Sequence, residues 1–132
     1  MTDAQRIRIL SVDDHPLLRE GLATIINSQA NMELVAQAAN AQEALQQFRK
    51  HQPDVTLMDL RLPDKSGIEA MITIRSEFPE ARIIILTTFD GEVEVQRALE
   101  AGARAYLLKS MPPKELMEVI CQVHAGNRRF PG

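Results

Sequence analysis

Short apolar runs alternate along the chain with longer segments in which apolar residues recur every three or four positions. A short run predicts a strand, and the longer periodic pattern predicts a helix. The runs lie at residues 7–12, 33–38, 55–58, 83–86 and 105–108, and a periodic segment follows each of them. This strand–helix alternation predicts an α/β fold, in which helices cover both faces of a parallel sheet.

Residues that commonly begin or end helices lie at the boundaries of the periodic segments. Pro16 is expected to begin the first helix, and Asn40 with Glu43 resembles a capping box at the start of the second. Asp90 is expected to cap the fourth helix, and Gly102 to end it. The helical residues expected to face inward include Leu17, Leu18, Leu22, Ile25, Ile26, Ala41, Ala44, Leu45, Phe48, Val95, Ala98, Leu99, Leu116, Ile120 and Val123.

The composition indicates one globular domain, since the chain has 132 residues and is 45% hydrophobic. It has neither a long apolar segment nor a charged leader, so we expect no membrane span, no signal peptide and a cytoplasmic location. The net charge of −3 and the few aromatic residues argue against direct nucleic-acid binding by this domain. Residues 1–126 form the predicted domain, and the polar residues 127–132 are expected to begin a linker.

Polar residues follow four of the five predicted strands. They are Asp13 and Asp14, Asp59, Thr87 and Lys109, after the first, third, fourth and fifth strands. Each alone has an ordinary explanation, because Asp commonly caps turns and helices and Thr favours strands. Parallel strands, however, deliver their carboxyl ends to one edge of the sheet, where α/β proteins bind ligands. The group therefore predicts a site there, whereas the neighbouring His15 is more typical of a surface residue.

Three carboxylates at one edge repel each other unless a cation is supplied. An all-oxygen ligand set suits a hard ion, Mg²⁺ or Mn²⁺, which in turn binds phosphate oxygens. Lys109 adds a second positive centre and Thr87 a hydroxyl donor, and both types of group stabilise a transferring phosphoryl group. Asp59 is the candidate nucleophile, since a carboxylate can form an aspartyl-phosphate.

Three stretches carry a resemblance to a known family, namely residues 11–16 (SVDDHP), 58–63 (MDLRLP) and 101–109 (AGARAYLLK). With these motifs, the chain resembles the receiver domain of bacterial two-component response regulators, in the LuxR/NarL-type, FixJ-like branch. The resemblance extends over residues 7–126. It implies a flavodoxin-like (βα)₅ fold, which is a doubly wound five-stranded parallel sheet in the strand order 2-1-3-4-5.

The resemblance implies a role for each residue of the metal site. Asp59 would accept a phosphoryl group from a sensor histidine kinase or a small phosphodonor. Asp14, Asp59 and the backbone carbonyl of Arg61 would bind Mg²⁺ directly, while Asp13 would act through water.

The resemblance also implies the residues of a switch. Thr87 and Lys109 would bind the phosphoryl oxygens, and Tyr106 would turn inward as Thr87 moves. Arg61 and Phe89 lie two residues after Asp59 and Thr87, at positions that tune the lifetime of the phosphoryl group in this family.

Members of this branch usually carry a helix-turn-helix DNA-binding domain after a linker. The expected partners are a cognate sensor histidine kinase, this C-terminal domain, and a second copy of the chain in a phosphorylation-dependent homodimer. The expected function is therefore a phosphorylation switch that controls transcription, and not a turnover enzyme.

Two other functions remain open. One is a stand-alone receiver or phosphorelay protein. The other is a Mg²⁺-dependent phosphatase with an aspartyl nucleophile, although such enzymes usually place a second Asp where this chain has Arg61.

Overall fold

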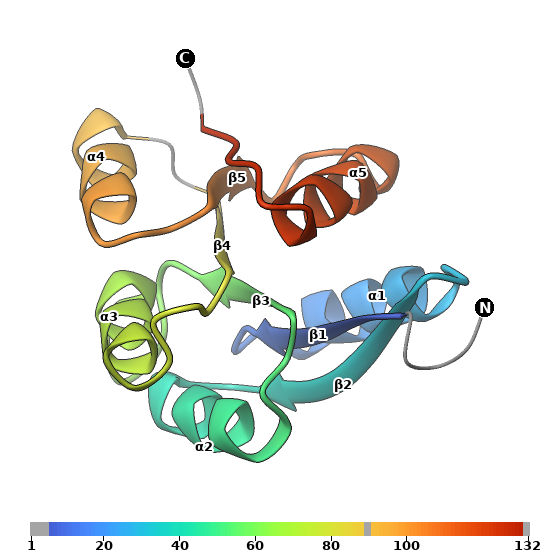
Figure 1. The fold of residues 1–132 in the computed structure, drawn as a ribbon, viewed down its shortest axis with the longest axis horizontal. Coiled ribbons are helices and arrows are strands. Elements are labelled where there is room, and N and C mark those ends of the chain that lie inside the picture. Colours follow the sequence, from blue (N-terminus) through green and yellow to red (C-terminus); the bar gives the residue numbers. More distant parts are fainter. Residues whose placement is uncertain (1–5, 89–90, 131–132) are drawn as a thin grey trace.

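The computed structural model describes residues 6–88 and 91–130. Five parallel strands form one sheet in the order β2-β1-β3-β4-β5, as predicted (Figure 1). The strands are β1 (Ile7–Val12), β2 (Met32–Ala38), β3 (Val55–Asp59), β4 (Ile83–Thr87) and β5 (Ala105–Leu108). The helices that follow them are α1 (Pro16–Asn27), α2 (Ala41–His51), α3 (Gly67–Glu77), α4 (Glu92–Glu100) and α5 (Pro113–His124).

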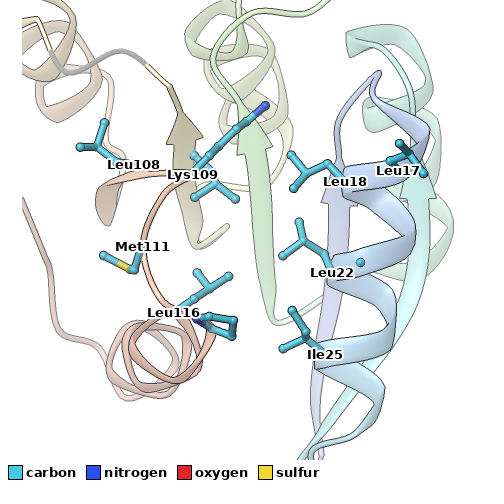
Figure 2. A pocket seen from close by; sticks show the side chains of 11 residues that line it. Leu17, Leu18, Leu22, Ile25, Leu108, Lys109, Met111 and Leu116 are labelled. Carbon is cyan, nitrogen blue, oxygen red and sulfur yellow. The ribbon is translucent and has the colours of Figure 1, made fainter.

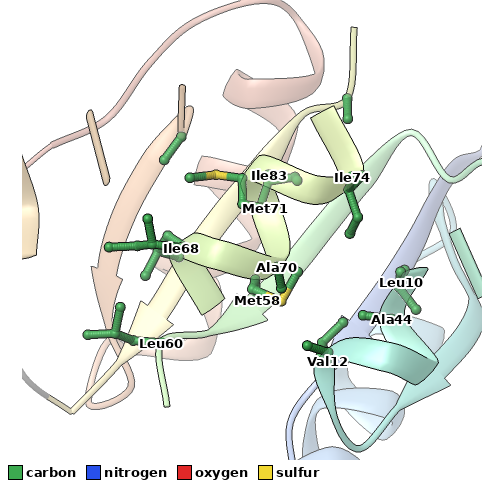
Figure 3. Close-up of a cluster of buried hydrophobic side chains, with 14 of the residues drawn as sticks. Leu10, Val12, Ala44, Met58, Leu60, Ile68, Ala70, Met71, Ile74 and Ile83 are labelled. Atoms are coloured by element: carbon green, nitrogen blue, oxygen red, sulfur yellow. The ribbon is translucent and has the colours of Figure 1, made fainter. Parts of the chain in front are cut away.

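The helices cover both faces of the sheet and enclose two apolar layers. On one face, side chains of α2, α3 and α4 pack against Leu10 and Val12 of β1, Met58 of β3 and Ile83 of β4 (Figure 3). On the other face, α1 and α5 pack against the alternate side chains of the same strands. All five residues of β3 and of β4 are buried, because both strands lie in the middle of the sheet between helices. This explains their continuous apolar sequences.

The start of α2 confirms the predicted capping box, with one difference. The side chain of Asn40 accepts a hydrogen bond from the N–H of Glu43 at 2.8 Å, whereas the Glu43 carboxylate accepts from Ala39, one residue before the cap. Asp64, in the loop after β3, accepts hydrogen bonds from the N–H groups of Ala41 at 2.9 Å and Gln42 at 3.0 Å. The loop that follows Asp59 is thus bound to the beginning of α2.

Two predictions about helix faces are wrong. Leu17 and Leu99 were expected to face inward, but they are 85% and 37% exposed. In each case the adjacent residue takes the inward position, since Leu18 packs against the core and Ala98 is fully buried. Neighbouring residues on a helix point about 100° apart, and here the orientation that buries Leu18 and Ala98 turns Leu17 and Leu99 towards solvent. The predicted cap Asp90 lies outside the described residues.

The chain after α5 returns to the sheet. Residues 127–130, predicted as the start of a linker, run beside β5, where Arg129 pairs with Ala105 in a parallel bridge. Among the residues that the structure describes, no helix is long and apolar enough to span a membrane.

Candidate functional site

The structure brings the predicted polar residues together at the carboxyl edge of the sheet. Asp13 follows β1, Asp59 ends β3, Thr87 ends β4 and Lys109 follows β5. Asp13, Asp59 and Thr87 are buried, and Lys109 is largely shielded from solvent. Buried carboxylates are retained only where they are paired or bind a cation. The edge of the sheet is therefore a polar site built into an apolar core.

Lys109 holds the two buried carboxylates. Its Nζ atom lies 2.9 Å from Oδ2 of Asp13 and 3.1 Å from Oδ2 of Asp59. Burial alone would lower the pKa of Lys109, but its hydrogen bonds to Asp13 and Asp59 outweigh this and raise the pKa. The ammonium group is thus kept charged between two acids.

The two buried acids have opposite pKa shifts. Burial raises the pKa of Asp59, and the negative charge of Asp13 raises it further, against the opposing effect of Lys109. Burial also acts to raise the pKa of Asp13, but hydrogen bonds from the His15 N–H and from Lys109 outweigh it, so this pKa is lowered. One neighbouring cation therefore does not fully compensate the charge of Asp59. A second positive charge would stabilise its ionised, nucleophilic form.

Asp14 and His15 complete an acidic cluster at the mouth of the site. The Nδ1 atom of His15 lies 2.8 Å from Oδ1 of Asp13 and 3.1 Å from Oδ1 of Asp14. Ligand atoms of Asp13, Asp14, His15 and Asp59 all lie within 4.8 Å of one another. The side chains of His15 and Asp14 are 65% and 35% exposed, so His15 is a surface residue, but one that contacts both acids.

The donor set fits a hard divalent cation. Three carboxylates converge on one point, and the Asp14 carboxylate is open to solvent. Mg²⁺ keeps several of its waters and takes only one or two carboxylates from a protein, which a partly open site allows. The raised pKa of Asp59 is a second observation that favours a cation, since cation binding would offset the repulsion between Asp59 and Asp13.

Backbone groups of the loop after β3 contact the candidate nucleophile, Asp59. The N–H of Arg61 donates to Oδ1 of Asp59 at 3.3 Å, and Arg61 pairs with Ser66 in an antiparallel bridge. The N–H of Gly67 donates to the carbonyl of Leu60 at 2.7 Å. A side chain at Gly67 would collide with the carbonyl oxygen of Asp59. Gly67 was not among the predicted site residues, and its only signal in the sequence is a glycine at the start of a helix.

The ends of β4 and β5 are also tied together. The N–H of Lys109 donates to the carbonyl of Thr87 at 2.7 Å, so the predicted switch residue and the predicted phosphoryl ligand share a backbone contact. Tyr106 is 1% exposed and lies in the apolar layer that includes Met58. The remaining predicted site residue, Phe89, lies outside the described residues.

An apolar pocket adjoins the site between α1 and α5. Its volume is about 160 Å³, and Leu18, Leu22 and Ile25 of α1 face Met111 and Leu116 across it (Figure 2). The carbon chain of Lys109 lies at one end of the pocket, while its nitrogen points away from these apolar side chains. The carbon chain of Lys109 thus packs against apolar side chains, while its ammonium group extends to the acids.

Comparison with known proteins matches residues 9–121 to the response regulator receiver domain model. A solved LuxR-family two-component response regulator from Aurantimonas sp. SI85-9A1 is 43% identical, with a TM-score of 0.90 over 94% of this chain and 89% of that one. The receiver domain of the response regulator NarL from Mycobacterium tuberculosis is 29% identical, with a TM-score of 0.89 over 93% of this chain and 99% of that one.

Curated relatives are longer than this chain. The transcriptional regulatory protein LnrK of Bacillus subtilis is 36% identical, over 95% of this chain and 57% of LnrK. The oxygen regulatory protein NreC of Staphylococcus epidermidis is 40% identical, over 91% of this chain and 56% of NreC. The chain thus spans somewhat more than half the length of these relatives.

Proposed function

Because this chain belongs to the response regulator receiver domain family, in its LuxR-type branch, we propose that it is a switch operated by phosphorylation of Asp59. The position of Asp59 carries the proposal. This carboxylate is buried at the carboxyl edge of the sheet, with Lys109 at 3.1 Å and the acids Asp13 and Asp14 beside it. Phosphoryl transfer is catalysed mainly by positioning and charge neutralisation, and this arrangement supplies both.

In the transfer step, an oxygen of the ionised Asp59 carboxylate attacks the phosphorus atom of the donor. A new bond forms between this oxygen and phosphorus. The bond from phosphorus to the nitrogen or oxygen of the leaving group breaks, and the leaving group keeps the electron pair. The product is an acyl phosphate on Asp59. Lys109, which now contacts the Asp59 carboxylate, would pair with an oxygen of the phosphoryl group.

Asp14, Asp59 and the backbone carbonyl of Arg61 would hold Mg²⁺ or Mn²⁺, and Asp13 would act through water. The exposure of Asp14 supports this assignment, since its side chain is 35% exposed whereas that of Asp13 is 3% exposed. When bound, the metal ion neutralises charge on the phosphoryl oxygens.

The proposed switch follows from the new charge on Asp59. The hydroxyl of Thr87 would bind a phosphoryl oxygen. Tyr106, predicted to turn inward as Thr87 moves, is already buried in this structure, so phosphorylation would favour this inward position. Such a local event can bias a domain between two conformations. Arg61 and Phe89 would tune the lifetime of the acyl phosphate by controlling the access of water.

The proposed donor is a cognate sensor histidine kinase in the cytoplasm. The proposed output is transcriptional, through a helix-turn-helix domain C-terminal to the receiver and through a phosphorylation-dependent homodimer. The names of LnrK, a transcriptional regulatory protein, and NreC, an oxygen regulatory protein, support a regulatory output. A stand-alone receiver is the alternative for the chain as a whole.

A phosphatase with an aspartyl nucleophile is less well supported. Such an enzyme needs a general acid near its nucleophile to protonate the leaving group. Two residues after Asp59, this chain has the exposed Arg61, which cannot serve as that acid. Steady release of phosphate from organic phosphates over many turnovers would contradict the switch and favour the phosphatase.

The proposal is tested by incubating the protein with acetyl phosphate and measuring its intact mass. We expect the mass of one phosphoryl group to be added, only when Mg²⁺ is present, and no addition in Asp59→Asn. Asp54→Asn is a matched control at the opposite end of β3, where the Asp54 side chain accepts a hydrogen bond from the backbone N–H of Arg8. Labelling that persists in Asp59→Asn would contradict the assignment.

A further inference from the structure

Residues 127–130, which we call the edge segment, run beside the outer edge of β5, and Arg129 pairs with it. The N–H of Tyr106 donates to the carbonyl of Arg129 at 3.0 Å, and the N–H of Arg129 donates to the carbonyl of Arg104 at 2.8 Å. Figure 1 shows the chain passing beside β5 after it leaves α5. Backbone groups at the edge of a sheet otherwise lack partners within the sheet. The edge segment thus acts as a short additional strand.

The register of this pairing places Phe130 next to Tyr106. Arg129 lies opposite Ala105 in a parallel bridge, so the next residue of each strand is also adjacent. Side chains alternate between the faces of a sheet, so the pair Phe130–Tyr106 lies on the opposite face from the pair Arg129–Ala105. Phe130 packs against the apolar layer that contains Tyr106, while Arg129 points to the α5 side and pairs with Glu115 at 2.8 Å.

We propose that the edge segment is an intramolecular docking element, and that its attachment to β5 is coupled to the position of Tyr106 and so to phosphorylation of Asp59. The coupling rests on the proposed function, whereas the docking does not. With Tyr106 buried, its ring belongs to the apolar surface on which Phe130 packs. If Tyr106 turned outward, Phe130 would lose part of this support. Each residue therefore stabilises the position of the other.

The coupling gives the switch a route to the rest of the protein. The edge segment is the point at which the chain leaves the receiver, so its docking sets where and in which direction any following residues start. If phosphorylation favours the buried Tyr106, it also favours the docked segment, and docking favours the phosphorylated conformation by the same factor by which phosphorylation favours docking. Undocking would release the chain from α5 onward, where Gly126 (φ 101°) makes the turn towards the segment.

Hydrogen exchange at the amide of Tyr106 measures docking directly, because this amide donates to the edge segment. We expect Tyr106 to be protected in the unmodified chain, and its protection to fall at least about tenfold in Phe130→Ala. The matched control is Arg128→Ala, since Arg128 is an exposed residue of the same segment, and we expect no change there. Equal exchange of Tyr106 in the unmodified chain and in Phe130→Ala would overturn the docking.

The coupling is tested on the same proteins with Mg²⁺ and beryllofluoride, a phosphoryl mimic. We expect increased protection of the Tyr106 and Arg129 amides. We also expect beryllofluoride to bind Phe130→Ala about fivefold more weakly than Arg128→Ala, a factor typical of coupled sites.

Two results would overturn the coupling while leaving the proposed function intact. One is an unchanged Tyr106 protection with beryllofluoride, and the other is an equal beryllofluoride affinity in the two variants, each in a protein that is labelled at Asp59. Failure of Asp59 to accept a phosphoryl group would overturn the proposed function and the coupling together. In that case the exchange data would still decide the docking.

Discussion

The Nζ atom of Lys109 lies 3.1 Å from Oδ2 of Asp59, the carboxylate at the end of the central strand β3. The same atom lies 2.9 Å from Oδ2 of Asp13. One ammonium group therefore joins the ends of β1, β3 and β5. A phosphoryl group on Asp59 would bring new negative oxygens to this ammonium, so the residue that stabilises the unmodified site is also placed to respond to its modification.

We expect Lys109→Met to lower the free energy of unfolding by about 2 kcal/mol near neutral pH. The substitution keeps an unbranched chain on the pocket wall, but leaves two buried carboxylates without their counter-ion, a change that is costly in proteins. Urea denaturation at neutral pH measures this loss. Lys114→Met is the control, because Lys114 is exposed and its replacement should change stability by less than about 0.5 kcal/mol. Equal effects of the two changes would contradict the role of Lys109.

We expect Asp59→Asn to raise the free energy of unfolding at neutral pH in the absence of Mg²⁺. The raised pKa of Asp59 means that the folded state binds its proton more tightly than the unfolded state. Stability therefore falls as pH rises from about 3.8, the ordinary value, through the raised pKa. Asn at this position removes that loss, so the stability of the variant should depend less on pH in this window.

The matched change Asp13→Asn should have the opposite sign. The lowered pKa of Asp13 contributes stability that is present above its ordinary value and is lost as pH falls through the lowered one. Denaturation curves from acid to neutral pH compare the two variants. A lower stability of Asp59→Asn than of the unmodified protein at neutral pH would contradict the conclusion that the charge of Asp59 destabilises the folded state.

We expect Mg²⁺ to raise the melting temperature, and a chelator to reverse the rise. At a free concentration about tenfold above the dissociation constant, the ion should add about 1.4 kcal/mol to the free energy of unfolding. Asp14→Asn should lose most of this effect, since Asp14 carries the most accessible carboxylate of the cluster. Asp54→Asn, at the other end of the sheet, should retain it. An equal Mg²⁺ response in both variants would exclude Asp14 as a ligand.

We expect Gly67→Ala to lower the free energy of unfolding by about 2 kcal/mol and to slow the labelling of Asp59. The added methyl group would collide with the carbonyl oxygen of Asp59, so either α3 or the end of β3 must move. Gly21→Ala is the matched control in α1, because an added methyl group there has no neighbour within 4 Å. Alanine is more favourable than glycine inside a helix, so the free energy of unfolding of this control should rise by about 0.5–1 kcal/mol. Thermal denaturation of the two variants distinguishes these outcomes.

The strands were predictable because burial between two layers of helices imposes continuous apolar runs. The predicted bounds of β1 and β5 match the structure, and β3 and β4 each extend one residue further, to Asp59 and Thr87. Pairing continues through these polar residues, since Asp59 lies opposite Leu86 and Thr87 opposite Leu108. It was also predictable that the polar site residues lie close together, because parallel strands end at the same edge of the sheet.

Other features depend on contacts between distant parts of the chain, and no local pattern reveals them. The polar composition of residues 127–132 predicted the start of a linker, but the backbone groups of Arg129 pair with the edge of β5. The contact of Gly67 with Asp59 depends on how closely α3 approaches β3. Hydrophobic periodicity placed Leu17 and Leu99 inward, but the helices turn their neighbours Leu18 and Ala98 towards the core instead.

The most direct test is to locate the phosphoryl group itself. The protein is incubated with acetyl phosphate and Mg²⁺, the acyl phosphate is reduced with borohydride to homoserine, and the modified residue is identified by peptide mass spectrometry. We expect one modified residue, Asp59 at the end of β3. Modification at Asp13 or Asp14 in its place, or no modification of a folded protein that binds Mg²⁺, would contradict the role of Asp59 as the phosphoryl acceptor.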